Sequence, residues 1–213
     1  MAEWSAWFDE VLPHVTGCPQ PVATHAIRNS AIQFCEDSRV WQIDHPLIDS
    51  VADTAEYTLA PGDGKKVVRL EMVWYEGNPL DPITTADLEA LYTGWTVETG
   101  EPKYFMQERL EALVLVPYPS AAVTDAIKAK VSVKPSRAAT VIDDVIHERY
   151  LEQIGRGARS RLHLMQRKPW TDVNLGSALA QQFEDDIAAA RFAAFKGHTR
   201  ARNRSTRGHR RFV

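Results

Sequence analysis

Two runs of apolar residues at helical spacing occupy the last third of the chain. The first recurs at steps of three and four residues and so lines one helix face: Leu151, Ile154, Ala158, Leu162 and Met165. The second follows Asn174, a typical N-cap residue: Leu175, Leu179, Phe183, Ile187, Ala190 and Ala194. Between them, residues 168–172 combine a helix-stopping proline with a short turn. The pattern predicts an antiparallel helical hairpin over residues 143–195.

Two glycines lie inside the first helix of this hairpin. Gly155 and Gly157 should each cost about 1 kcal/mol relative to alanine unless another segment approaches the backbone closely. They indicate tight packing, within the chain or against another copy; the alternative is that they only weaken or kink the helix. Trp170, in the turn, is a further candidate for subunit packing, because large rigid aromatic residues anchor cores and interfaces.

The chain also begins with helical patterns. The first predicted helix is short and is interrupted at Pro13, with a stripe of apolar residues: Trp4, Trp7, Phe8, Val11 and Val15. Pro21 is suited to the first turn of a second helix, which we expect to run to about Asp37. Two helices therefore precede any strand.

The middle of the chain has the period of two that is typical of strands. The clearest case pairs an apolar set with a polar one: Ile127, Ala129, Val131 and Val133 with Lys128, Lys130, Ser132 and Lys134. An earlier strand is expected to bury Val68, Leu70, Met72 and Trp74 on one face. Residues 56–59 predict another strand, residues 84–92 a brief capped helix, and residues 103–107 with 112–116 a hairpin.

Helices at both ends and strands between them favour an α+β fold over a doubly wound one. We predict a helical bundle from residues 1–38 and 137–195, with a small antiparallel β-domain inserted at residues 39–136. Residues 196–213 are predicted to form an extended, basic and flexible tail, because they contain many arginines and little apolar material.

Charge is distributed unevenly along the chain. The net charge of all 213 residues is −3. The last 18 residues contain no acid and seven cations: Lys196, Arg200, Arg202, Arg204, Arg207, Arg210 and Arg211. The preceding 195 residues therefore have a net charge of −10. An acidic body precedes a basic tail.

No segment has the composition of a membrane span or a secretion signal, so we expect a protein that stays in the cytoplasm in which it is made, with no membrane partner. Cys18 and Cys35 are too few for a disulfide framework and are expected to be buried thiols.

Motifs for chemistry are weak. Residues 62–66 lack the spacing of a phosphate-binding loop, and His147-Glu148 has no second histidine for a metal site. The carboxylate groups Asp143-Asp144 and Glu184-Asp185-Asp186 fit a helix N-terminus and a solvated helix face better than acid–base catalysis. We expect no catalytic residues, no cofactor and no metal.

The basic tail has two interpretations. Its arginines suit nucleic-acid phosphates, with a strong dependence on salt. They also suit an acidic protein partner, with Phe212 and Val213 as a small apolar anchor. The tail alone does not decide between them.

Several stretches, in this order and spacing, resemble the head-to-tail adaptor (connector) proteins of short-tailed bacteriophages. Residues 26–41 are similar to the family's early helix and first strand, and residues 168–170 to the turn of its hairpin. Shorter stretches resemble its strand and turn signatures: residues 55–59, 77–80, 100–104, 115–119 and 134–136.

The resemblance implies a structural virion protein at the head–tail junction. Such adaptors form a ring, usually of twelve subunits, beneath the portal; the ring contacts tail (nozzle or tail-tube) proteins and surrounds the channel for genomic DNA, which it does not bind by sequence. The family also favours the portal as partner of the tail, here Lys196, the six arginines, Phe212 and Val213. The main alternative is a DNA-binding packaging or tail-completion factor.

Overall fold

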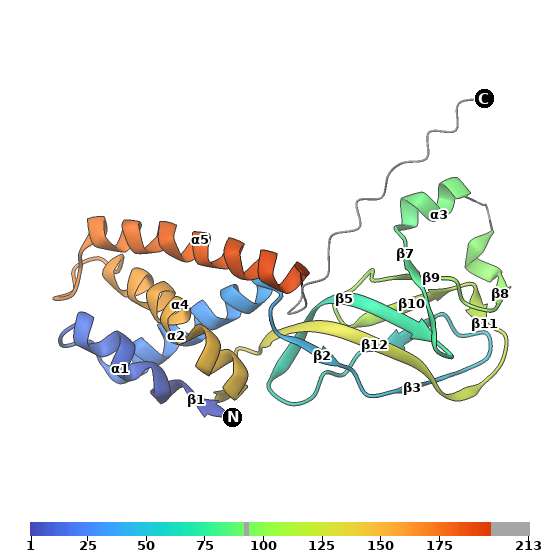
Figure 1. Cartoon of the computed structure of the whole chain (residues 1–213), viewed down its shortest axis with the longest axis horizontal. Coiled ribbons are helices and arrows are strands. Elements are labelled where there is room, and N and C mark those ends of the chain that lie inside the picture. The colour runs from blue at the N-terminus through green and yellow to red at the C-terminus, as the bar shows by residue number, and fades with distance from the viewer. Residues whose placement is uncertain (92–93, 197–213) are drawn as a thin grey trace.

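The computed structural model describes residues 1–91 and 94–196. The long helices gather at one end of the molecule and the long strands at the other, as Figure 1 shows. This arrangement confirms the mixed α+β class. The predicted tail, apart from Lys196, lies outside the described residues.

The helical part combines both ends of the described chain. From the N-terminal end come η1 (Trp4–Trp7), α1 (Phe8–Val11), η2 (Leu12–His14) and α2 (Gln20–Ser38). From the C-terminal end come α4 (Asp144–His163) and α5 (Val173–Lys196). Helices α2, α4 and α5 pack against one another, and α1 packs against α4. Pro21 lies in the first turn of α2, as predicted.

The predicted hairpin of α4 and α5 is present, with one correction to its caps. Asp143 caps α4 by accepting a hydrogen bond from the Val145 amide (3.0 Å). The cap of α5 is Asp172, whose carboxylate accepts from the Leu175 amide (2.9 Å). Asn174 was the wrong choice, because α5 begins at Val173 and Asn174 already lies in its first turn.

Helix α4 is kinked, though not at its glycines. Tyr150 has non-helical dihedral angles (φ −126°, ψ 25°) inside the helix. Beside it, the Trp7 indole N–H donates a hydrogen bond to the Leu151 carbonyl (3.1 Å). A side chain that hydrogen-bonds to the helix backbone is a recognised cause of kinks. We therefore attribute the kink in α4 to Trp7.

The strands form two main sheets. In the first, β12 (Val123–Pro135) is central: β2 (Gln42–Asp44) and β3 (Ile48–Ser50) pair with one edge and β5 (Lys65–Tyr75) with the other, followed by β6 (Asn78–Pro79). The second has the order β4 (Glu56–Thr58), β10 (Ala112–Val116), β9 (Tyr104–Met106) and β7 (Asp81–Pro82). Two short ladders join β1 (Ala2–Glu3) to β13 (Val141–Ile142) and β8 (Thr99–Gly100) to β11 (Tyr118–Pro119).

The β-part is not wholly antiparallel. The pairs β7–β9 and β8–β11 are parallel, whereas the long ladders are antiparallel. Parallel neighbours need a long connection, and β7 reaches β9 only after α3 (Thr85–Leu91) and η3 (Trp95–Val97). The predicted helix at residues 84–92 thus permits a pairing that the sequence pattern did not predict.

Strand β5 corrects a prediction about which residues are buried. Its inward residues are Val67, Leu70, Val73 and Tyr75, whereas Met72 is 48% exposed. The pairing with β12 skips Glu71 and Val68, so these two are bulged. Each extra residue shifts the alternation by one position, which gives β5 an inward period of three. Strand β12 keeps its predicted period of two, with Ile127, Ala129, Val131 and Val133 buried.

One core runs through both parts of the molecule. It includes Trp7 and Phe34 from the helices and Leu113 and Val131 from the sheets. The Trp4 indole N–H also donates a hydrogen bond to the Ala139 carbonyl (2.8 Å). This bond connects the start of the chain to the segment that follows β12. A smaller cluster lies beneath α3: Leu88, Trp95, Met106, Val114 and Val116. The boundaries predicted at residues 38 and 136 stay a prediction.

The glycines of α4 allow close approach within a single chain. A Cβ atom on Gly155 would lie 2.5 Å from the Glu10 Cγ, and one on Gly157 would lie 2.7 Å from the Phe183 ring. Helix α1 therefore approaches α4 at Gly155, and α5 approaches it at Gly157. Their role in subunit packing, like that of the partly buried Trp170, stays a prediction.

The close contact at Gly157 predicts an unusual effect of alanine. Alanine at a helical glycine normally stabilises by about 1 kcal/mol. At Gly157 overpacking against the rigid Phe183 ring should exceed that gain and lower the free energy of unfolding by about 1–2 kcal/mol. Gly155→Ala should lose less, since Glu10 is a flexible side chain, although its movement would disturb its ion pair with Arg159 (3.1 Å). Urea unfolding of both variants measures the difference, and Gly157→Ala combined with Phe183→Leu should recover the loss. A stabilising Gly157→Ala would contradict the packing argument.

Candidate interaction surfaces

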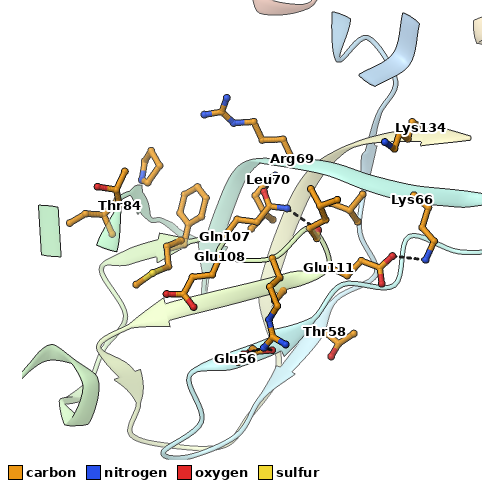
Figure 2. A pocket seen from close by; sticks show the side chains of 18 of the residues that line it. Glu56, Thr58, Lys66, Arg69, Leu70, Thr84, Gln107, Glu108, Glu111 and Lys134 are labelled. Atoms are coloured by element: carbon orange, nitrogen blue, oxygen red, sulfur yellow. Dashed lines mark hydrogen bonds and ion pairs between the residues drawn. The ribbon is translucent and has the colours of Figure 1, made fainter. Parts of the chain in front are cut away.

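A groove of about 1180 Å³ opens between the edge of β5 and the turn from β9 to β10, and Figure 2 shows it. Strand β6 pairs only with Trp74 and Tyr75, so the rest of this β5 edge has no strand partner among the described residues. Apolar side chains line the groove together with charged ones of both signs: Val67, Leu70, Ile83, Phe105, Met106, Glu56, Lys66, Arg69, Asp87, Glu108, Arg109, Glu111 and Lys134.

Gln107 connects the two walls of the groove. Its side-chain oxygen accepts from the Leu70 amide (2.9 Å), and its side-chain nitrogen donates to the Leu110 carbonyl (2.8 Å). The side chain thus takes the place of a partner strand at one residue of the β5 edge. It also fixes the β9–β10 turn against β5.

Two ion pairs cross the walls of the groove. Lys66 contacts Glu111 (2.6 Å), and Arg109 contacts Glu56 (2.5 Å). All four side chains are well exposed, so each pair contributes about 0–1 kcal/mol. These pairs shape the surface more than they stabilise the fold.

The β5–β12 ladder has a basic outer face. Directly paired residues share a face, and four pairs lie on the face of β12 opposite Ile127, Ala129, Val131 and Val133: Lys128–Trp74, Lys130–Met72, Ser132–Arg69 and Lys134–Lys66. Ser132 is buried on this face, and Lys130 and Lys134 are half-buried. We call Lys66, Arg69, Lys128, Lys130 and Lys134 the basic face. The two bulges of β5 bring Lys66 and Arg69 onto it. The alternating lysines of β12 are visible in the sequence, but only the cross-strand register joins them to β5.

Three cations of the basic face have no ion pair within the described residues. Lys66 and Lys134 are paired with Glu111 and Glu36, whereas Arg69, Lys128 and Lys130 are not paired. Lys128 lies over the Trp74 ring, 5.4 Å from its centroid. Asp44 of β2 lies opposite Lys130, so the face is predominantly, not wholly, basic.

Residues 81–91 and 94–108, which we call the acidic lobe, have the opposite charge. Lys103 is its one cation. Its six acids are Asp81, Asp87, Glu89, Glu98, Glu101 and Glu108. Its α3 and β8 lie at the end of the β-part away from the helices (Figure 1). Leu91 is 60% exposed and Val97 is 78% exposed. The acidic lobe therefore combines negative charge with exposed apolar side chains.

The end of α5 presents a second exposed apolar surface. Phe192 and Phe195 are exposed, and the Lys196 ammonium lies 4.1 Å from the Phe192 ring centroid. The arginines predicted to bind the portal, with Phe212 and Val213, lie outside the described residues. Of the predicted portal-binding set, Lys196 alone is described, at the last position of α5.

These surfaces belong to a chain that matches the family model of the SU10 adaptor protein over residues 7–211. The chain belongs to this family of phage head–tail adaptors. The expected resemblance to such adaptors is confirmed, and the match extends through most of the arginine-rich segment. No curated protein shows a significant sequence match to the chain.

The carboxylates that were weighed for acid–base chemistry have structural partners in the adaptor. Asp143 caps α4, and Asp144 pairs with the N-terminal ammonium group. Asp186 pairs with Arg156, and Glu184 accepts a hydrogen bond from the Gln33 side chain (3.0 Å). In residues 1–91 and 94–196, no group of three or more His, Cys, Asp or Glu is placed to hold a metal.

Both cysteines of the adaptor are free thiols. Cys35 is fully buried, and this burial raises the pKa of its thiol well above the ordinary value. Cys18 is only partly buried, and desolvation raises the pKa of its thiol as well. A raised pKa keeps a thiol protonated and poorly nucleophilic at neutral pH. None of the described helices of the adaptor is long and apolar enough to cross a membrane.

The double contact of Gln107 predicts how the groove responds to mutation. Gln107→Ala leaves the Leu70 amide without its acceptor and frees the β9–β10 turn, so the free energy of unfolding should fall by about 1–2 kcal/mol. Gln107→Glu keeps the acceptor and should retain more of the stability. Urea unfolding and hydrogen exchange at Leu70 measure both effects. Unchanged exchange at Leu70 in Gln107→Ala would show that the contact does not protect the β5 edge.

Proposed function

We propose that the adaptor forms a ring, of twelve subunits, beneath the portal at the head–tail junction of the virion. One face of the ring binds the portal and the other binds tail proteins. Genomic DNA passes through the central channel during packaging and ejection, without sequence-specific contacts. The observation that carries this proposal is the family match over residues 7–211, which covers nearly the whole chain.

In this proposal residues 1–38 and 137–195 act as one helical bundle and residues 39–136 as an inserted β-domain. The packing of α2 against α4 and α5 supports the bundle. The contact of Trp4 with Ala139 and the core shared by both parts support a rigid connection between them. A rigid body with two different ends suits a subunit that must bind unlike partners above and below.

The basic tail is proposed to bind the portal. Helix α5 ends in exposed Phe192 and Phe195, and large exposed apolar residues mark interaction sites when they gather together. Directly after them the chain continues into a segment with six arginines and no acid. An apolar anchor followed by a cationic segment suits an acidic protein groove.

The arginines also support a second candidate function, in which the adaptor is a DNA-binding packaging or tail-completion factor. Clustered arginines release counterions when they bind phosphates. The body is a poor contributor to such binding, because residues 1–195 have a net charge of −10. The two functions therefore differ in what the tail binds.

Removal of residues 197–213 tests the proposal. The truncated protein should fold but bind the portal of the same phage at least about tenfold more weakly. Six arginines at about 0.2–1 kcal/mol each total roughly 1.2–6 kcal/mol, and a tenfold change needs roughly 1.4 kcal/mol. Native mass spectrometry of the portal mixed with the adaptor measures both the affinity and the number of subunits added.

Two control variants identify the tail's partner. Replacement of the six arginines by lysine keeps the charge, and replacement by glutamine removes it. Glutamine should reproduce the truncation, and lysine should retain more binding. Unchanged portal binding by the truncated protein, together with lost binding to duplex DNA at low salt, would establish the second candidate function.

A further inference from the structure

We propose that neighbouring copies of the adaptor meet through opposite charges, with the basic face of one copy against the acidic lobe of the next. This inference rests on the proposed ring and names the two surfaces that join its subunits. Neither surface has an assigned role in the proposed contacts with portal, tail proteins or DNA.

The first observation is the segregation of charge within an acidic region. Residues 39–136 contain nine cations and fifteen acids. Six of the nine cations lie on β5 and β12, with two of the fifteen acids: Lys65, Lys66, Arg69, Lys128, Lys130 and Lys134 against Glu71 and Asp125. The acidic lobe has a net charge of −5. A single chain thus presents two surfaces of opposite sign, which adjoin at the groove, where Lys66 and Arg69 lie with Asp87 and Glu108.

The second observation is that both surfaces have exposed apolar residues as well as charge. Met72 is 48% exposed and lies opposite Lys130 on the basic face, beside the partly exposed Trp74. Leu91 and Val97 are exposed on the acidic lobe. Apolar side chains with charge around them are the usual composition of a protein interface. Duplex DNA offers no comparable partner for Met72 or Val97.

The third observation is that the charges are available and the surfaces are rigid. Arg69, Lys128 and Lys130 on one side, and Glu98 and Glu101 on the other, have no ion pair within the described residues. The basic face stands on the longest ladder of the fold. Leu88, Trp95 and Met106 of the acidic lobe pack against Val114 and Val116 of β10. A second copy would find both surfaces already formed, so association costs little ordering.

A contact between two different surfaces of identical subunits is head-to-tail. Such contacts close into a ring when the rotation between copies allows it, which is the symmetry that the proposed function requires. The basic face is therefore assigned to one side of each subunit boundary and the acidic lobe to the other.

Charge reversal on each surface tests the inference. The first variant is Lys128→Glu with Lys130→Glu, the second is Glu98→Lys with Glu101→Lys, and a third has all four changes. The matched control is Arg167→Glu with Lys168→Glu, which makes the same change of charge in the exposed turn between α4 and α5, at the far end of the helical part (Figure 1). Circular dichroism and thermal unfolding establish that each variant is folded.

Assembly of the full-length chain is measured by native mass spectrometry and sedimentation velocity, alone and with the portal. The first and second variants should each associate at least about tenfold more weakly than the wild type. An equimolar mixture of the two should recover association, because each then meets a partner of opposite charge. The third variant should also recover it. The control should associate as the wild type does, and salt near 0.5 M should weaken the wild type by screening.

Each other outcome overturns the inference in a recognisable way. If the first variant loses association that neither mixing nor the third variant restores, the basic face meets something other than the acidic lobe. If it assembles normally but loses affinity for duplex DNA, the face binds DNA. If all variants form rings as the wild type does, the ring stands and these surfaces do not join it. If the wild type forms no ring with or without the portal, the proposed function itself fails.

Discussion

Strand β12 is the constraint on which the rest of the adaptor depends. Strands β2 and β3 pair with one of its edges and β5 with the other, and α2 packs against it as well. Its inward residues Ile127, Ala129, Val131 and Val133 are completely buried. A strand with both edges paired and one face in the core cannot shift its register without exposing that whole set. The register of β12 therefore fixes the positions of β5, of α2 and, through the shared core, of the helical part.

Long and strongly periodic segments could be predicted from the sequence because their burial is one-sided. The α4–α5 hairpin, α2 and the inward face of β12 all follow from apolar spacing. The errors arose where a local pattern has two solutions. Asn174 and Asp172 both suit an N-cap, and only the start of α5 at Val173 decides between them. The alternation of β5 likewise looks regular until its pairing with β12 reveals two extra residues.

The candidate surfaces also differ in how far the sequence alone predicts them. A count of arginines is sufficient to find the basic tail, since no geometry is needed to see seven cations without an acid. The basic face needs cross-strand register, because Lys66 and Arg69 join the lysines of β12 only through the bulges of β5. The acidic lobe needs tertiary structure as well: Glu98 and Glu101 lie in segments without periodicity, and the cluster around Leu88 and Trp95 holds those segments in place.

Weak contacts suit a protein that should assemble only at the right place. Exposed ion pairs contribute about 0–1 kcal/mol each, so subunits joined chiefly by such pairs associate poorly at low concentration. A portal that binds each subunit through a separate segment raises the effective concentration of neighbours to the millimolar range. Contacts too weak to make rings in solution then suffice to close one on the portal. In the proposed ring, the basic tail would select the partner, while the rigid ladder and the acidic lobe would supply many small and reversible contacts.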